Sequence, residues 1–145
     1  MKQTNDVISN VLASCHTIAV IGLSAKSNRA SHGVSQYMQQ HGYRIIPVNP
    51  TYAGTRILDE YCYASLGEAA QALRKDNVKI ELVDCFRQSE AIPAIADDAI
   101  AIGARCLWMQ LGIVNEEAAR KALAAGLDVV MDRCIKIEHM RWQMQ

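Results

Sequence analysis

A loop that begins at Gly22 and ends at Gly33 mixes hydroxyl and basic side chains, GLSAKSNRASHG in one-letter code. Lys26 and Arg29 supply positive charge, and the serines supply hydroxyl groups. The loop matches neither the GxGxxG pattern of dinucleotide-binding folds nor the Walker A pattern. A helix is expected to begin within it, so the free N–H groups at the start of that helix would also face an anion. We therefore predict that the loop binds phosphate groups; a plain polar surface loop is the alternative.

The residues after the next apolar segment help to distinguish between nucleotide ligands. Proteins that bind NAD usually place Asp or Glu at this point, where the carboxylate binds the ribose 2′-hydroxyl. Here the sequence reads Val48-Asn49-Pro50 and offers no carboxylate. An NADP site would need a nearby arginine, and Arg56 lies several residues further on. The sequence therefore weakens an NAD(P) assignment, which stays open as the alternative.

Cysteine and histidine residues show no spacing typical of a metal site or a disulfide framework. The five cysteines form no C-x-x-C pair, and the four histidines are scattered. We expect reduced thiols, as in a cytoplasmic protein, with no metal ion and no catalytic residue. The cysteines are Cys15, Cys62, Cys85, Cys106 and Cys134.

Apolar segments rich in β-branched residues alternate with helical patterns along the chain. The expected strands are 17–22, 43–49, 79–84, 105–109 and 127–131. The expected helices are 4–14, a segment from Asn28 or Ser31 to Gly42, a helix of about ten residues that begins at Ser65, 89–101 and a segment from Asn115 to Gly126. Only a short tail is expected after the fifth strand.

This alternation predicts an α/β fold, a Rossmann-like doubly wound parallel sheet of five strands with helices on both faces. Right-handed crossovers favour the strand order 3-2-1-4-5, counted along the chain. Ligands of such sheets bind at the carboxyl ends of the strands, here beside the switch between the first and fourth strands. The segments expected at that edge are 22–33, 49–50, 86–87, 109–112 and 132–134.

Length and charge exclude several classes of protein. A chain of 145 residues is expected to form one domain, residues 1–145. Its 15 basic and 15 acidic residues cancel, so it lacks the basic excess typical of proteins that bind nucleic acid or anionic membranes. No apolar run approaches the roughly 18 residues of a membrane span. Residues 1–6 lack the apolar core of a secretion signal, so we expect a cytoplasmic protein.

Five short motifs resemble a known family. They are IAVIGLS at 18–24, PVNP at 47–50, VDCFR at 83–87, LWMQLG at 107–112 and MDRC at 131–134. In this order they resemble the CoA-binding domain family, whose fold also forms the N-terminal domain of the succinyl-CoA ligase alpha subunit. The chain is most similar to the small, stand-alone bacterial members, the YccU-like group.

The resemblance implies that the chain binds CoA or acyl-CoA. It places the phosphates at the hydroxyl and basic residues of the loop, and the adenosine near the residues that follow the second and third strands. Core packing is the alternative role for Phe86, and helix capping is the alternative for Arg87. The residues assigned to the CoA site are Gly22, Leu23, Ser24, Lys26, Arg29, Asn49, Pro50, Phe86, Arg87, Met109, Gln110 and Cys134.

The last of these residues, Cys134, is expected to lie near the CoA thiol. Arg133 would favour its reactive thiolate, whereas Asp132 would oppose it. We therefore expect a modestly reactive thiol that exchanges with oxidised CoA as a side reaction. Cys15 and Cys62 are expected to be exposed and are the next candidates.

The resemblance also bears on catalysis. Ligases with this fold need further domains and a phosphorylated histidine loop, which we do not expect here. We therefore expect a non-catalytic sensor or carrier of CoA or acyl-CoA, with no prediction of its protein partner. Two alternatives stay open: an NAD(P)-linked or thiol-redox enzyme on the same fold, and an interaction module whose nucleotide site is vestigial.

Overall fold

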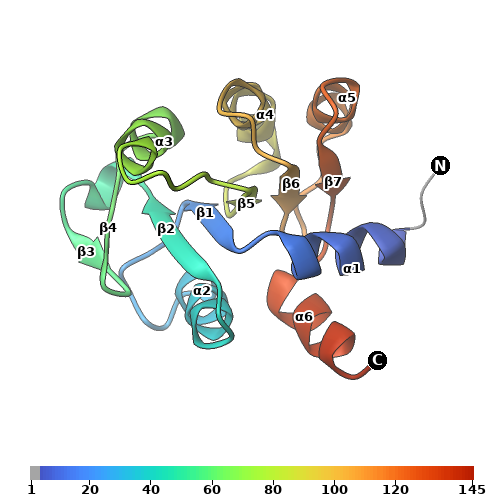
Figure 1. Ribbon diagram of the computed structural model, residues 1–145, viewed down its shortest axis with the longest axis horizontal. Coiled ribbons are helices and arrows are strands. Elements are labelled where there is room, and N and C mark those ends of the chain that lie inside the picture. Colours follow the sequence, from blue (N-terminus) through green and yellow to red (C-terminus); the bar gives the residue numbers. More distant parts are fainter. Residues whose placement is uncertain (1–3) are drawn as a thin grey trace.

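The fold is built on a five-stranded parallel sheet in the order β2-β1-β5-β6-β7 (Figure 1). The computed structural model describes residues 4–145. Residues 1–3, part of the segment inspected for a secretion signal, lie outside the described residues. The strands are β1 (Thr17–Ile21), β2 (Arg44–Val48), β5 (Leu82–Cys85), β6 (Cys106–Met109) and β7 (Asp128–Val130).

Helices cover both faces of the sheet, which confirms the predicted Rossmann-like α/β class (Figure 1). One face carries α1 (Thr4–Ser14), α2 (Ala30–Gln40) and α6 (Ile135–Gln143). The other carries α3 (Leu66–Arg74), α4 (Ile92–Ala101) and α5 (Glu116–Ala124). Each layer buries its own apolar cluster against the sheet, so β1, β5 and β6 are covered on both faces. No helix within residues 4–145 is long and apolar enough to span a membrane.

The predicted strand order, 3-2-1-4-5, is wrong. Counted along the chain, the strands of this sheet follow 2-1-3-4-5, so β2 is an edge strand. Pro47 in β2 explains this order, because a proline has no N–H and is tolerated only where the ladder is open. Two residues further on, Asn49 points its N–H outward to the Tyr63 carbonyl (2.9 Å), so position 47 also faces the outer side. A strand paired on that side would lack one hydrogen bond.

The corrected order moves the topological switch. Successive connections reverse direction between β1 and β5, the first and third strands of the sheet, and not between the first and fourth. The loops after these two strands therefore lead to helices on opposite faces of the sheet, and they separate at its carboxyl edge. A crevice at that edge is expected in sheets of this order.

The local signals for helix starts were partly confirmed. Ser65 Oγ accepts the Glu68 N–H (3.2 Å) and Asn115 Oδ1 accepts the Ala118 N–H (2.9 Å), as the two capping motifs predict. For α2, neither Asn28 nor Ser31 is the cap, because the helix begins after Arg29, which offers no side-chain cap.

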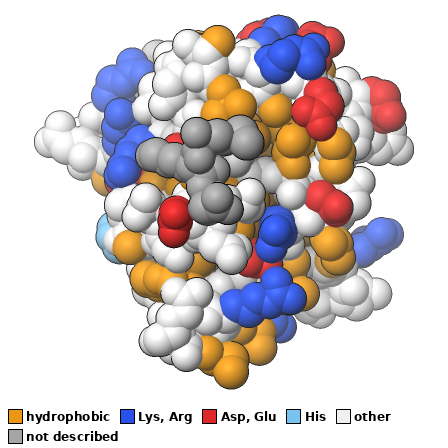
Figure 2. Space-filling view, turned by 90° about the vertical axis from the view of Figure 1, so that its right-hand side faces the viewer, with side chains coloured by type: hydrophobic (Ala, Val, Ile, Leu, Met, Phe, Trp, Pro, Cys, Tyr) orange, Lys and Arg blue, Asp and Glu red, His pale blue; other side chains and the backbone are white. Residues whose placement is uncertain are grey.

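Two regions were not predicted from the sequence. A short 3-10 turn (Pro50–Tyr52) and the hairpin of β3 (Arg56–Ile57) and β4 (Glu60–Tyr61) that follows it have too few residues for a periodic signal. The helix expected over 89–101 begins with a 3-10 turn (Ser89–Ala91), and α4 starts only at Ile92. The expected short tail contains α6, which buries the polar residues Glu138 and His139 and exposes Ile137, Met140 and Met144. Figure 2 shows that end of the molecule, with apolar side chains exposed in its lower part. Apolar and polar residues on both sides of α6 hide its helical periodicity.

Candidate functional site

A cavity of about 370 Å³ lies at the carboxyl edge of the sheet, where α2 begins. We call it the phosphate cavity. Its lining comes from the loops after β1, β2 and β5, the loops that a switch between β1 and β5 brings together. The lining residues are Gly22, Ser24, Lys26, Arg29, Ala30, Ser31, Asn49, Thr51, Tyr52 and Phe86.

Gly22 is the point at which these loops approach most closely. Its φ of +91° lies in the region that favours glycine, and its N–H donates to the Val48 carbonyl (2.8 Å). A Cβ atom at this position would clash with the carbonyl oxygen of Phe86. The absence of a side chain therefore lets the backbone of the loop after β1 lie against that of the loop after β5.

The loop 22–33 is held in shape by its own hydroxyl groups. Ser31 Oγ accepts the Ser24 N–H (3.0 Å), and Ser24 Oγ accepts the Lys26 N–H (3.1 Å). Lys26 and Arg29 line the phosphate cavity and are exposed, and within residues 4–145 neither side chain forms an ion pair. The start of α2 has no acidic side chain in its first turn. Two uncompensated cations and a positive helix end thus border one cavity, an arrangement suited to an anion.

Asn49 ties the loops of the cavity together. Its side chain is buried, and Nδ2 donates to the Leu23 carbonyl (3.0 Å). Oδ1 accepts the Thr51 N–H (3.0 Å) and lies 3.3 Å from Nη2 of Arg87. A carboxylate could not donate to Leu23, which gives a physical reason for an amide where NAD-binding folds use an acid. Asn49 therefore positions the loop and Arg87.

A second, more open cavity of about 540 Å³ adjoins the first. Phe86 lines both cavities, so they meet at this residue. The lining of the second cavity, which we call the apolar groove, consists of Phe86, Arg87, Gln88, Ala91 and Ile113. Pro50, also assigned to the site, is exposed at the first 3-10 turn beside the phosphate cavity.

Besides Asn49, three of the residues assigned to the site have buried side chains. Leu23 and Met109 lie in the core and contribute no side chain to either cavity lining. Gln110 is also buried: its Nε2 donates to Asp84, and its Oε1 accepts the Ile135 N–H (3.3 Å). Gln110 therefore links the sheet to the start of α6.

Asp84 was not singled out from the sequence. It lies fully buried in β5, and burial raises the pKa of its carboxyl to about 7, although the hydrogen bond from Gln110 opposes that rise. A carboxyl residue in an otherwise apolar strand was the feature of the sequence that could have indicated this buried group.

Thr51 and Tyr52 also line the phosphate cavity but were not predicted. They directly follow the motif at 47–50.

Cys134 lies outside both cavity linings. It is half-buried, precedes the first residue of α6 and packs against the core on that face. Nη1 of Arg133 lies 3.6 Å from Oε1 of Glu138, so the charge expected beside the thiol is directed elsewhere. Cys15 and Cys62 are buried, which corrects their expected exposure, and burial raises the pKa of both thiols.

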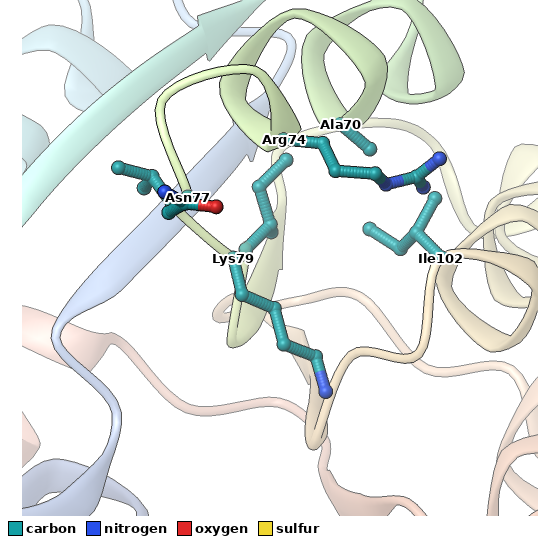
Figure 3. A pocket seen from close by; sticks show the side chains of 7 residues that line it. Ala70, Arg74, Asn77, Lys79 and Ile102 are labelled. Atoms are coloured by element: carbon teal, nitrogen blue, oxygen red, sulfur yellow. The ribbon is translucent and has the colours of Figure 1, made fainter.

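A further cavity, of about 310 Å³, lies at the opposite, amino-terminal edge of the sheet (Figure 3). Arg74 and Lys79 border it, but Figure 3 shows their side chains extending in different directions. Arg74 belongs to the last turn of α3, where a positive charge complements the helix dipole. The carboxyl-edge cavity is therefore the better candidate for an anionic ligand.

Comparison with known proteins identifies the family. Residues 16–140 match the model of a family described as CoA binding domain. The chain belongs to this CoA-binding domain family. It is 41% identical over 133 residues to YneT, an uncharacterized protein of Bacillus subtilis, with 91% of each chain covered.

Solved structures show the same fold at similar length. A hypothetical protein from Pyrococcus horikoshii superposes with a TM-score of 0.85 at 35% identity, covering 97% of this chain and 93% of its own. A Thermus thermophilus protein superposes with a TM-score of 0.82 at 30% identity, covering 98% and 99%. The resemblance to the CoA-binding domain family is thus confirmed over most of the chain.

Proposed function

We propose that this CoA-binding domain protein binds CoA or an acyl-CoA with the phosphates in the phosphate cavity, and that it acts as a sensor or carrier. The observation that carries this proposal is the convergence of Lys26, Arg29 and the start of α2 on one cavity in a member of this family. Charge-assisted hydrogen bonds from these groups suit the pyrophosphate and the 3′-phosphate of CoA.

The adenosine of the ligand is placed on the β2 side of the cavity. Tyr52 offers aromatic surface there, and Pro50 adds a rigid exposed ring. Arg87, held by Asn49, lies at the junction of the two cavities. Stacking of the base on an aromatic ring would supply affinity that a phosphate alone lacks.

A non-catalytic role is supported by the chemistry of the cavity. Its lining among the described residues includes no Asp, Glu, His or Cys, so carboxylates, imidazoles and thiols are missing from it. The alternative, an NAD(P)-linked or thiol-redox enzyme, is less favoured. Asn49 uses both of its amide atoms within the protein, and Cys134 lies outside the cavity linings.

Replacing Arg29 with alanine should weaken CoA binding by about 2 kcal/mol, roughly 30-fold in Kd, because charge-assisted bonds to phosphate are lost. Lys26→Ala should have a smaller effect, since its ammonium is a flexible point charge. Both effects should shrink as salt concentration rises. Isothermal titration calorimetry measures them.

Arg120→Ala is the matched control for this experiment, because Arg120 is an exposed arginine on α5. The Arg120→Ala variant should bind CoA with the same affinity as the wild type. If Arg29→Ala also retained full affinity, the loop 22–33 would not hold the phosphates and the proposed site would be wrong.

A further inference from the structure

We propose that the apolar groove holds the acyl chain of an acyl-CoA, so that the protein prefers thioesters of short or medium fatty acids to free CoA. This inference rests on the proposed CoA site and names its ligand more closely. The groove shares Phe86 with the phosphate cavity.

Continuity of the two cavities gives the ligand a direction. The pyrophosphate of CoA joins the adenosine on one side to the pantetheine arm on the other. With the adenosine on the β2 side, next to Tyr52, the arm leaves across Phe86 and enters the groove. The thioester and its chain then lie toward Ile113.

The groove is apolar where the chain would lie. Among its lining residues only Arg87 is charged, and the contact of its Nη2 with Asn49 Oδ1 (3.3 Å) draws the guanidinium toward the phosphate cavity. The apolar surface of the groove comes from Phe86, Ala91 and Ile113. Such a lining favours a methylene chain over a hydrated or charged group.

The loop that contains Ile113, which we call the rim loop, exposes two large apolar side chains. Leu111 and Val114, on the loop that contains Ile113, are 67% and 44% exposed. Scattered single apolar residues are ordinary on a surface, but these two flank a groove-lining residue in one loop. A bound acyl chain would cover such surface.

The rim loop is also fixed in place before any ligand binds. Ser89 Oγ accepts the Val114 N–H (3.2 Å), and the Asn115 amide donates to the Ser89 carbonyl (2.9 Å). Ser89 begins the 3-10 turn that contains Ala91, so these bonds join two segments that line or border the groove. A preformed wall lowers the entropic cost of holding a flexible chain.

The test compares CoA, acetyl-CoA, butanoyl-CoA and hexanoyl-CoA by isothermal titration calorimetry. Complete burial would tighten binding about fourfold per methylene. Because the groove is open on one side, we expect hexanoyl-CoA to bind roughly tenfold more tightly than acetyl-CoA. The double variant Leu111→Ser/Val114→Ser should reduce that ratio to about threefold or less. Leu123→Ser removes an equally exposed leucine from α5 and should leave the ratio at its wild-type value.

The outcomes separate this inference from the proposed function. Equal affinities for CoA and hexanoyl-CoA would overturn the acyl site and leave CoA binding intact. A chain-length preference that survives in the double variant would place the acyl chain elsewhere and also overturn the inference. Absence of binding by CoA itself would instead overturn the proposed function.

Discussion

Gly22→Ala is expected to lower the free energy of unfolding by about 3 kcal/mol and to abolish CoA binding at the phosphate cavity. An alanine at φ +91° is strained, and its Cβ would lie 3.2 Å from the carbonyl carbon of Phe86 and closer still to the carbonyl oxygen. Both atoms belong to the backbone, so relief requires the loops after β1 and β5 to separate. Urea denaturation measures the loss of stability.

Gly42→Ala separates the clash from the conformational strain. Gly42 also has a positive φ, +95°, but no heavy atom lies within 4 Å of the added Cβ. This variant should lose only about 1 kcal/mol, the cost of the left-handed conformation, and should bind CoA normally. An equal loss of unfolding free energy in the two variants would show that the close approach of the two loops at Gly22 does not contribute to stability.

Asp84→Asn is expected to stabilise the protein at pH 8 and to change it little at pH 4. Burial raises the pKa of Asp84 to about 7 in the folded protein, whereas an unfolded aspartate ionises near pH 4. The folded state therefore keeps a proton that the unfolded chain has lost, and stability falls as pH rises from 4 through 7. The loss attributable to this group reaches at most about 4 kcal/mol.

The measurement is urea denaturation of wild type and variant at several pH values. Asparagine stays neutral, so the wild-type and Asp84→Asn curves should converge at pH 4 and separate between pH 4 and 7, with a constant difference above pH 7. Asp98→Asn, at an exposed position on α4, serves as the control and should follow the wild type. Parallel curves for wild type and Asp84→Asn would mean that the buried carboxyl does not titrate as described.

Much of the fold followed from local patterns in the sequence. Ser65 and Asn115 marked helix starts because a side-chain oxygen can cap only a nearby N–H. Strand order is different, since it depends on contacts between distant segments. Pro47 does indicate the strand order, because a residue without an N–H suits an edge strand. That indication is noticed only when the pairing of each strand with its neighbours is considered.

The sequence predicted which loops meet at the carboxyl edge of the sheet, but not the contacts among their side chains. The loop 22–33 and Phe86 line the phosphate cavity, as expected for residues that follow adjacent strands. Leu23 and Gln110 belong to the same motifs but point into the protein, where Gln110 bonds Asp84. Motif membership does not distinguish residues that face a ligand from residues that hold the loop. That distinction depends on side-chain direction in the folded chain.

CoA binding at the carboxyl edge is tested most directly by native mass spectrometry of the protein mixed with equimolar CoA and NADH. Both ligands carry a pyrophosphate and an adenosine, so the measurement tests the choice of nucleotide. The account predicts one CoA bound per chain, with little NADH adduct. Preferential binding of NADH, or the bare protein alone, would contradict it.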